Sequence, residues 1–225
     1  MKTFVIIVAG GKGMRMKKAI PKQFLLLNSQ PILMHTLKQF YTFDKNIKII
    51  LVLPQHQIIY WKELCEDYNF NIPHIVTKGG NTRFQSVKNG LNNIKEKGLV
   101  AIHDGVRPLV SFETLNNCFV EAEKSGNAIP VVEIEESIRL LENNKNKTVS
   151  RLNYRIVQTP QIFSTELIKE AYKCEYSSDF TDDSSVLEKT GVKINLVPGN
   201  KENIKITTKQ DLEIAEILLT KLQEN

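Results

Sequence analysis

The stretch TFVIIVAGGKG, residues 3–13, places a short β-branched run directly before a loop rich in glycine. This order is typical of a buried strand that ends where an open α/β sheet binds its ligand. The segment begins like a signal peptide, but its apolar run is short. Lys12 and Arg15 also stand where a small-residue cleavage site is expected. We therefore interpret residues 4–8 as the first strand of a sheet.

Strand and helix patterns alternate outward from this stretch. β-favouring runs are found at about residues 4–8, 47–53, 74–77, 99–103, 128–132 and 193–197. Helical patterns are found at about 31–43, 56–68, 82–97, 112–124, 165–172, 182–189 and 209–222. Such alternation predicts βαβ units around a mostly parallel sheet flanked by helices. The expected fold class is α/β, in one domain that spans residues 1–225.

One segment interrupts the alternation. Residues 133–157 contain few large apolar side chains, with a polar turn at 143–147 and β-favouring stretches on both sides of it. An isolated hairpin is marginally stable in water and usually packs on something else. We predict a projecting β-arm here, and it suggests a partner subunit.

The composition excludes several classes of protein. With 41% hydrophobic and 24% charged residues, the chain is neither collagenous, low-complexity nor disordered. No apolar run approaches the roughly 18–20 residues of a membrane span, so we expect no membrane partner. Cys65, Cys118 and Cys174 are odd in number and too widely spaced for a zinc motif. They indicate unreactive thiols in a reducing, cytoplasmic location.

The net charge of +5 is concentrated near the N-terminus. Residues 1–43 contain seven Lys or Arg and no acidic residue, while the rest of the chain contains 23 basic and 25 acidic residues. A protein that coats a nucleic acid distributes its basic residues over a whole face. The cluster between Lys12 and Lys22 indicates a local anion site instead, and we expect no nucleic-acid partner.

Glycines and charged residues follow the predicted strands. GGKGMRM and PKQ follow the first strand, GGNTR the third, HDGVRP the fourth, and PGN with a nearby NIK the last. The carboxyl ends of parallel strands meet at one edge of a sheet, where ligands bind. Glycines, Arg15, Lys22 and the strand-end Asp104 are groups that bind a phosphate ester and a divalent metal. The pattern is neither a P-loop nor the G-x-G-x-x-G fingerprint, which fails at Met16.

Each feature also has a plainer interpretation. The first loop fits a flexible basic surface loop, and Asp104 fits a salt bridge to Arg107. His103 fits a packing role rather than metal ligation. Residues 181–183, TDD, fit a helix N-cap followed by acidic residues in the first turn. The sequence alone leaves these alternatives open.

Six motifs, taken in order, resemble one known family. They are A-G-G-x-G-x-R-M with P-K-Q-F, G-G-x-x-R, H-D-x-x-R-P, Q-T-P-Q, T-D-D-x-S and N-I-K-I-T, between about residues 3 and 222. The sequence resembles the 2-C-methyl-D-erythritol 4-phosphate cytidylyltransferases of the non-mevalonate isoprenoid pathway. This resemblance implies a Rossmann-like sheet, and a β-arm that exchanges between the subunits of a homodimer. It also implies Mg²⁺-assisted transfer of a cytidylyl group from CTP to a phosphorylated polyol, with release of pyrophosphate.

The resemblance also implies roles for individual residues. Arg15 and Lys22 would stabilise the transition state. The nucleotide would be bound by Ala9, Gly10, Gly11, Gly80, Asn81, Arg83, Ser86, Asp104 and Gly105, and Asp104 would take the magnesium. The methylerythritol phosphate would be bound by Arg107, Arg151, Thr159, Thr181 and Lys205, of which Arg151 and Thr159 would reach across the dimer. Gly10 and Asn81 depart from an alanine and an aspartate that are common in the family.

The proposed chemistry needs no general base, because a phosphate monoester with a second pKa of about 6 is mostly dianionic at neutral pH. The lack of a paired His and Glu candidate therefore agrees with it. Two alternatives remain. One is a ribitol 5-phosphate cytidylyltransferase, which has a similar loop and P-K-Q-F. The other is a non-catalytic nucleotide- or RNA-binding module, which leaves Asp104 and the arm without a role. Its basic run also lacks the interleaved aromatic residues that base stacking requires.

Overall fold

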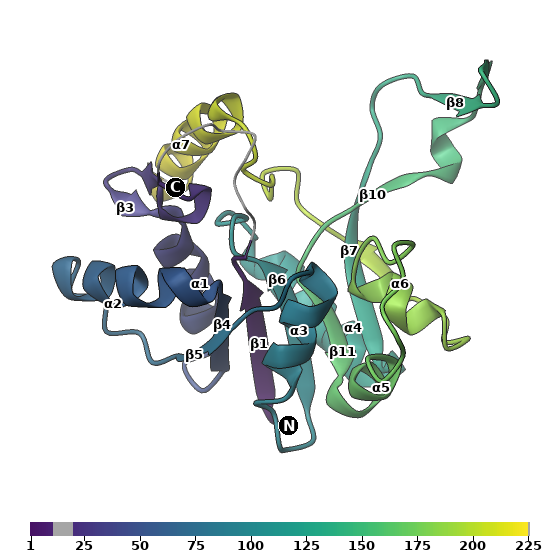
Figure 1. The fold of residues 1–225 in the computed structure, drawn as a ribbon. Helices are drawn as coiled ribbons and strands as arrows, with labels where there is room; N and C mark the ends of the chain where they lie inside the picture. The colour runs from purple at the N-terminus through teal and green to yellow at the C-terminus, as the bar shows by residue number, and fades with distance from the viewer. Residues whose placement is uncertain (11–19, 225) are drawn as a thin grey trace.

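The computed structural model describes residues 1–10 and 20–224. In this part of the chain, β1 (Thr3–Val8) lies inside an eight-stranded sheet (Figure 1). It pairs in parallel with β4 (Lys48–Leu53) on one side and with β6 (Leu99–Asp104) on the other. β5 (Ile75–Lys78) continues the parallel order beyond β4. The predicted first strand is confirmed.

The other half of the sheet mixes strand directions. β11 (Gln161–Ser164) is antiparallel to both β6 and β7 (Asn127–Glu133). β12 (Leu196–Pro198) pairs in parallel with β7, and β10 (Arg155–Val157) pairs antiparallel to it. The predicted α/β class with a mostly parallel sheet is therefore confirmed, with β10 and β11 as the antiparallel strands.

Helices cover both faces of this sheet (Figure 1). Val5 and Ile7 of β1 point into one core and Phe4 and Ile6 into the other, as the two-residue period of a strand requires. The first core is closed by α1 (Ile32–Phe43), α2 (Ile58–Asp67) and α4 (Phe112–Ser125). The second is closed by α3 (Arg83–Leu91), α5 (Thr165–Ala171) and α6 (Asp183–Glu188).

A third, smaller core lies beside the end of β6. The C-terminal helix α7 (Lys209–Glu224) packs there against the short pair β2 (Leu26–Leu27) and β3 (Gln30–Pro31). Two single-turn 3-10 helices, η2 (Lys22–Phe24) and η3 (Gln55–Gln57), follow the first loop and β4. No helix in residues 1–10 and 20–224 has both the length and the apolar character that crossing a bilayer demands.

Two predicted boundaries differ most from the structure. The helix expected at 82–97 ends at Leu91, because Asn92 and Asn93 form a turn, a conformation that asparagine favours. The strand expected from residue 193 begins at Leu196. Just before it, the side chain of Asn127 bonds the backbone of residues 193 and 195 and replaces the first sheet hydrogen bonds.

The segment that follows β7 extends away from the body (Figure 1). β8 (Arg139–Glu142) and β9 (Lys145–Thr148) form a two-stranded hairpin, and η4 (Arg151–Asn153) leads back to β10. The turn residues Asn143 and Asn144 have φ of 48° and 60°, which is the left-handed geometry of a tight hairpin turn. We refer to residues 133–157 as the arm.

Candidate functional site

The glycine-rich strand ends meet at one edge of the sheet. The Gly105 N–H donates to the Val8 carbonyl at 2.9 Å, and a Cβ on Gly105 would lie 2.9 Å from the Cβ of Ala9. The Gly80 N–H donates to Ser86 Oγ at 3.1 Å, and a Cβ on Gly10 would lie 3.9 Å from that oxygen. The structure therefore brings together the predicted nucleotide-binding positions 9, 10, 80, 86 and 105.

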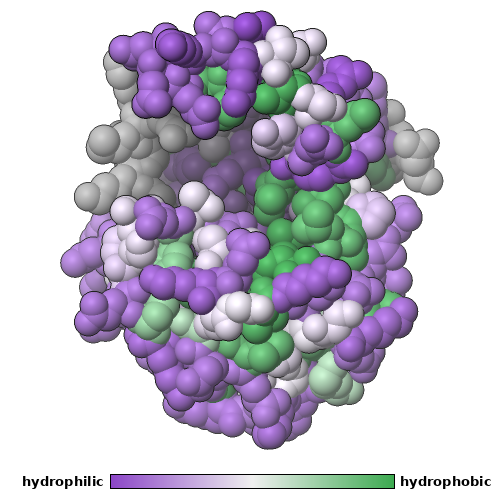
Figure 2. Space-filling view, turned by 90° about the vertical axis from the view of Figure 1, so that its right-hand side faces the viewer, coloured by the Kyte–Doolittle hydropathy of each residue, from purple (hydrophilic) through white to green (hydrophobic). Residues whose placement is uncertain are grey.

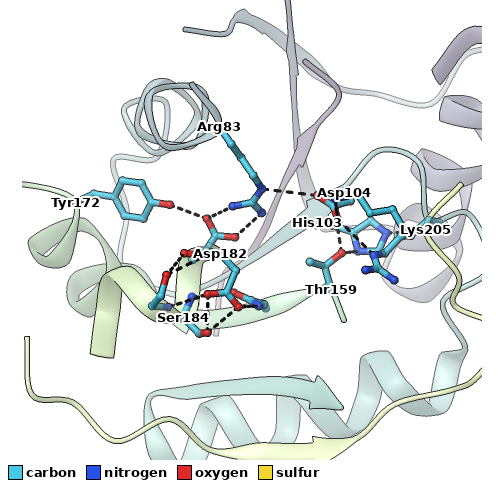
Figure 3. Close-up of polar contacts among 12 residues, drawn as sticks. Arg83, His103, Asp104, Thr159, Tyr172, Asp182, Ser184 and Lys205 are labelled. Atoms are coloured by element: carbon cyan, nitrogen blue, oxygen red, sulfur yellow. Dashed lines mark hydrogen bonds and ion pairs between the residues drawn. The ribbon is translucent and has the colours of Figure 1, made fainter. Parts of the chain in front are cut away.

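Asp104, the last residue of β6, lies among three cations (Figure 3). Its Oδ2 is 3.0 Å from Lys205 Nζ and 3.4 Å from Arg107 Nε, and its Oδ1 is 3.7 Å from Arg83 Nε. Burial alone would raise the pKa of the Asp104 carboxyl. The charges of Arg83, Lys205 and Arg107 overcome this effect and hold the pKa well below its usual value. The salt bridge to Arg107 that the sequence left open is thus one of three.

Thr159 and His103 hold the end of β6 in place. The Asp104 N–H donates to Thr159 Oγ1 at 3.1 Å, and this hydroxyl is 3.1 Å from His103 Nδ1. His103 Nε2 donates to the Arg107 carbonyl at 3.0 Å, so its Nδ1 accepts from Thr159. Burial lowers the pKa of His103 to about 4, which keeps the ring neutral. The single hydroxyl proton of Thr159 is therefore already in use within its own chain.

Arg83 makes its shortest contacts with a residue that the sequence analysis did not assign to the site. Its two terminal nitrogens donate to the Asp183 carboxylate at 2.8 and 2.6 Å. The Tyr172 hydroxyl donates to the same carboxylate at 2.6 Å. The TDD motif does contain the helix N-cap, but the cap is Asp182, whose side chain accepts from the Ser185 N–H, and not Thr181 as the motif predicted. The TDD motif gave the only sequence signal for Asp183, and it indicated nothing more than a first-turn acid.

Lys22 is half-buried in η2, and its neighbour Gln23 fixes this turn. Gln23 is 1% exposed, and its Nε2 donates to the Ala9 carbonyl at 2.8 Å and to Gln57 Oε1 at 2.6 Å. The P-K-Q-F motif contained this glutamine, but the sequence gave it no role. The bonds tie η2 to the end of β1, which places Lys22 next to the glycine-rich edge. The predicted residues Gly11 and Arg15 lie outside the described residues.

Three predicted residues are exposed, unlike Asp104 and Arg107. Asn81 and Thr181 are exposed. Arg151 is an exposed residue of η4 in the arm, where it donates to the carbonyl of Glu135 (Figure 1). One chain therefore does not bring Arg151 to Asp104. Below the arm the molecule is hollowed, and hydrophilic side chains line the back of the hollow (Figure 2).

The side chains at this edge suit a metal ion that is coordinated mainly by a bound substrate. In residues 1–10 and 20–224, no three His, Cys, Asp or Glu side chains gather in a group that could hold a metal ion. Asp104 thus offers a single carboxylate among cations. Magnesium is usually held by one or two carboxylates together with substrate phosphates and waters, so Asp104 with a bound triphosphate fits this ion.

Two of the three thiols are poor nucleophiles. Burial raises the pKa of Cys118 to about 12 and that of Cys65 to about 11, so both stay protonated at neutral pH. Cys174, like the other two, forms no disulfide. The charged groups around Asp104 are therefore the better candidates for the chemistry of this site.

Comparisons with known proteins agree with this geometry. A family model described as 2-C-methyl-D-erythritol 4-phosphate cytidylyltransferase (IspD) matches residues 3–221. The protein of that name from Phocaeicola vulgatus is 52% identical over 219 residues, which is 97% of this chain and 100% of that protein. Among solved structures, 4-diphosphocytidyl-2C-methyl-D-erythritol synthase from Anaerococcus prevotii has a TM-score of 0.83 at 28% identity, covering 97% and 99% of the two chains. The Francisella tularensis cytidylyltransferase has a TM-score of 0.80 at 34% identity, covering 96% and 99%.

Proposed function

Because the chain belongs to the 2-C-methyl-D-erythritol 4-phosphate cytidylyltransferase family, we propose that it transfers the cytidylyl group of CTP to 2-C-methyl-D-erythritol 4-phosphate. The products are 4-diphosphocytidyl-2-C-methyl-D-erythritol and pyrophosphate. The observation that supports this most directly is the convergence of Arg83, Arg107 and Lys205 on Asp104. This convergence occurs where the glycine-rich strand ends meet, an arrangement suited to two phosphorylated ligands.

The reaction requires charge stabilisation rather than proton abstraction. An oxygen of the dianionic acceptor phosphate forms a bond to the α-phosphorus of CTP, while the bond to the pyrophosphate oxygen breaks and its electron pair leaves with pyrophosphate. Two anions must therefore be held together, and preorganised cations lower the cost of doing so. Lys22, in η2 beside the end of β1, would stabilise the transition state in this way, and we assign Arg15 the same role.

The acceptor phosphate is best matched by Lys205. The side chain of Lys205 is 42% exposed, whereas that of Arg107 is 12% exposed and also donates to the Asn203 carbonyl at 2.7 Å. Lys205 is therefore free to turn toward a ligand, while Arg107 keeps Asp104 compensated. The Thr159 hydroxyl is already bonded to the Asp104 N–H and to His103, so Thr159 holds the end of β6 in place.

Magnesium is the metal that we propose for this site. When bound to the triphosphate, it supplies further neutralisation of charge at the α-phosphorus. Asp104 is the residue that would hold it, and the lowered pKa of this carboxyl keeps it ionised throughout the neutral pH range. Gly10 leaves room for the nucleotide to approach the backbone, since even a Cβ there would meet only Ser86 Oγ at 3.9 Å.

The acceptor is proposed from the relatives. Proteins named for methylerythritol phosphate are 52% identical along almost the whole chain, which favours this substrate over ribitol 5-phosphate. Asp104 lies at this site, where it would hold the metal. A non-catalytic nucleotide- or RNA-binding module would leave Asp104 without a role. We further propose a cytoplasmic location, where the three thiols would stay reduced.

We also propose one domain over residues 1–225 and a homodimer formed through the arm. Leu141 and Leu152 of the arm are 76% and 75% exposed, and Ile156 in β10 is 49% exposed. Figure 2 shows hydrophobic side chains gathered on this face of the molecule. Exposed apolar surface of this kind marks an interaction site. A second copy of the chain would cover this apolar surface. It would also bring the partner's Arg151 toward Asp104.

The function is tested by identifying the product. CTP, Mg²⁺ and acceptor labelled with ¹⁸O in its phosphate are incubated with the protein, and the mixture is followed by ³¹P NMR. We expect pyrophosphate and a diphosphate ester that retains one labelled oxygen in the bridge between its phosphorus atoms. A label found only in unreacted acceptor, with CTP intact, would contradict the proposal. Melting provides a check on binding: CTP with Mg²⁺ should raise the midpoint, and single-stranded RNA should not.

A further inference from the structure

Asp183 is fully buried, and its carboxylate is occupied by donors from two other elements. Its exposed fraction is 0%, so a ligand at the surface cannot touch it. Oδ1 accepts from one terminal nitrogen of Arg83 and from the Tyr172 hydroxyl, and Oδ2 accepts from the other terminal nitrogen. These contacts and the ion pair of Arg83 with Asp104 form a chain that links Tyr172 to Asp104, both of which are labelled with Arg83 in Figure 3. A buried carboxylate bound in this way orients its partner.

The surroundings fix this carboxylate in position. The Nε2 of Gln161, in strand β11, donates to Asp182 at 2.7 Å, and its Oε1 accepts from the Ser184 N–H at 2.8 Å. The start of α6 is therefore bonded to the sheet itself. Tyr172 stacks on Phe84, the neighbour of Arg83 on α3, with ring centroids 4.6 Å apart. Asp183 and Tyr172 are thus held relative to Arg83 by packing as well as by hydrogen bonds.

This arrangement determines which edge of Arg83 faces the metal-binding candidate. Both terminal nitrogens are bonded to Asp183, so only Nε faces Asp104, at 3.7 Å. An arginine without such a partner prefers a two-point contact with the nearest carboxylate. For Arg83 that carboxylate would be Asp104, and a two-point contact would cover both of its oxygens.

We propose that Asp183, held by Tyr172, is a positioning residue that keeps the two-point face of Arg83 away from Asp104, so that the Asp104 carboxylate stays open to the metal–nucleotide complex. The inference rests on the proposed function for the identity of that complex. It makes Asp183 necessary for tight binding of CTP with Mg²⁺ although it touches neither.

The test is CTP binding by isothermal titration, with Mg²⁺ and with EDTA. Asp183→Asn places an amide donor against the Arg83 donors and should free Arg83 to move onto Asp104. We expect the affinity for CTP with Mg²⁺ to fall roughly 10–100-fold, the usual range for outer-shell partners of a metal site. The affinity in EDTA should change much less. Tyr172→Phe removes one hydrogen bond and should shift the affinity in the same direction by less. Glu188→Gln, an exposed position on the same helix, is the matched control.

The double variant Asp183→Asn with Arg83→Gln distinguishes a changed orientation of Arg83 from a general disturbance of the site. If Arg83 masks Asp104 in Asp183→Asn, removing Arg83 should restore part of the ratio between the CTP affinities with Mg²⁺ and with EDTA, because any direct contact of Arg83 with the nucleotide is lost in both conditions. A double variant with the same ratio as Asp183→Asn, or an Asp183→Asn variant with an equal loss with Mg²⁺ and with EDTA, would overturn the inference. Melting of the free proteins identifies a variant that fails to fold, and Tyr172→Phe then decides the outcome by its Mg²⁺ dependence. This test uses no acceptor, so failure of the proposed acceptor chemistry leaves its result intact.

Discussion

At the scale of single residues, Gln23 shows how one buried side chain places another. It has no charge to offer the reaction, but its bonds to Ala9 and Gln57 fix the turn that contains Lys22. We expect Lys22→Ala to lower kcat by on the order of 10²–10³, because one preorganised cation is lost from the transition state. Lys38→Ala, an exposed lysine from the same basic N-terminal region, is the control. Steady-state turnover close to normal in Lys22→Ala would remove this residue from the mechanism.

The close approach of two strand ends leads to a second residue-scale prediction. A Cβ on Gly105 would lie 2.9 Å from the Ala9 Cβ and 3.0 Å from Leu33 Cδ1. Gly105→Ala should therefore lower the free energy of unfolding by about 1–3 kcal/mol and weaken CTP binding, because the first loop is pushed outward. Urea denaturation measures the first effect. Gly10→Ala is the stability control, since its Cβ meets only Ser86 Oγ at 3.9 Å; equal stability losses in both variants would contradict this account.

The sequence predicts some of these contacts and not others. Asp104, Arg107 and Lys205 follow predicted strands, so the rule that strand ends meet at one edge was enough to group them. The pairing of Arg83 with Asp183 joins residues separated by 100 positions. Nothing in either residue's neighbourhood reveals it, because an acid in the first turn of a helix already has a local explanation.

At the scale of whole elements, periodicity was informative wherever strands and helices were long. The continuous apolar run at residues 4–8 predicted a buried strand, and the alternation of strand and helix patterns predicted a sheet flanked by helices. β11 was missed because its four residues are too few to show a period, and its place in the sheet comes from long-range pairing with β6 and β7. The end of α3 was misplaced because Ile94 keeps helical spacing and is fully buried, although Asn92 and Asn93 have already turned the chain.

The edge formed by α2 and β5 supports a pH prediction. The only tryptophan, Trp61, donates from Nε1 to His74 Nε2 at 2.9 Å, and His74 Nδ1 donates to the Ile72 carbonyl at 2.7 Å. Burial lowers the pKa of His74 below its usual 6.5. The unfolded chain therefore takes up this proton first, so the stability contributed by neutral His74 is complete above pH 6.5 and is lost as the pH falls below it.

Tryptophan emission measures this loss directly. We expect the fluorescence of the folded protein to titrate below pH 6.5, because protonated His74 no longer accepts from Trp61. Trp61 and His74 line a surface cavity together with Lys62, Cys65 and Glu66. Burial raises the pKa of Cys65 to about 11, so this thiol does not titrate in this range. His35→Gln should leave the titration in place and His74→Gln should abolish it. A titration that survives in His74→Gln would contradict the assignment.

At the scale of the whole molecule, the proposed homodimer would divide the site between two subunits. Arg151 lies on the arm and Asp104 at the strand edge, so Arg151→Ala and Asp104→Asn should each be nearly inactive alone. In a mixed dimer, one site regains both native residues. Refolding the two variants together at equal concentration should therefore restore about a quarter of wild-type activity.

Self-refolded samples of each variant are the controls for this complementation. Sedimentation should show a dimer in every sample, because neither substitution removes the exposed apolar residues of the arm. A mixture no more active than its parents would contradict the exchange of Arg151 between subunits, and a monomer in sedimentation would contradict the dimer itself.

The central claim is that this edge of the sheet joins CTP to a methylerythritol phosphate. The most direct test is the initial rate of pyrophosphate release with CTP and Mg²⁺, measured side by side with 2-C-methyl-D-erythritol 4-phosphate and with ribitol 5-phosphate. The account predicts turnover with the first acceptor, little with the second, and loss of the first in Asp104→Asn. Turnover with ribitol 5-phosphate alone would leave the fold and the charge-stabilised mechanism in place and contradict the assigned substrate.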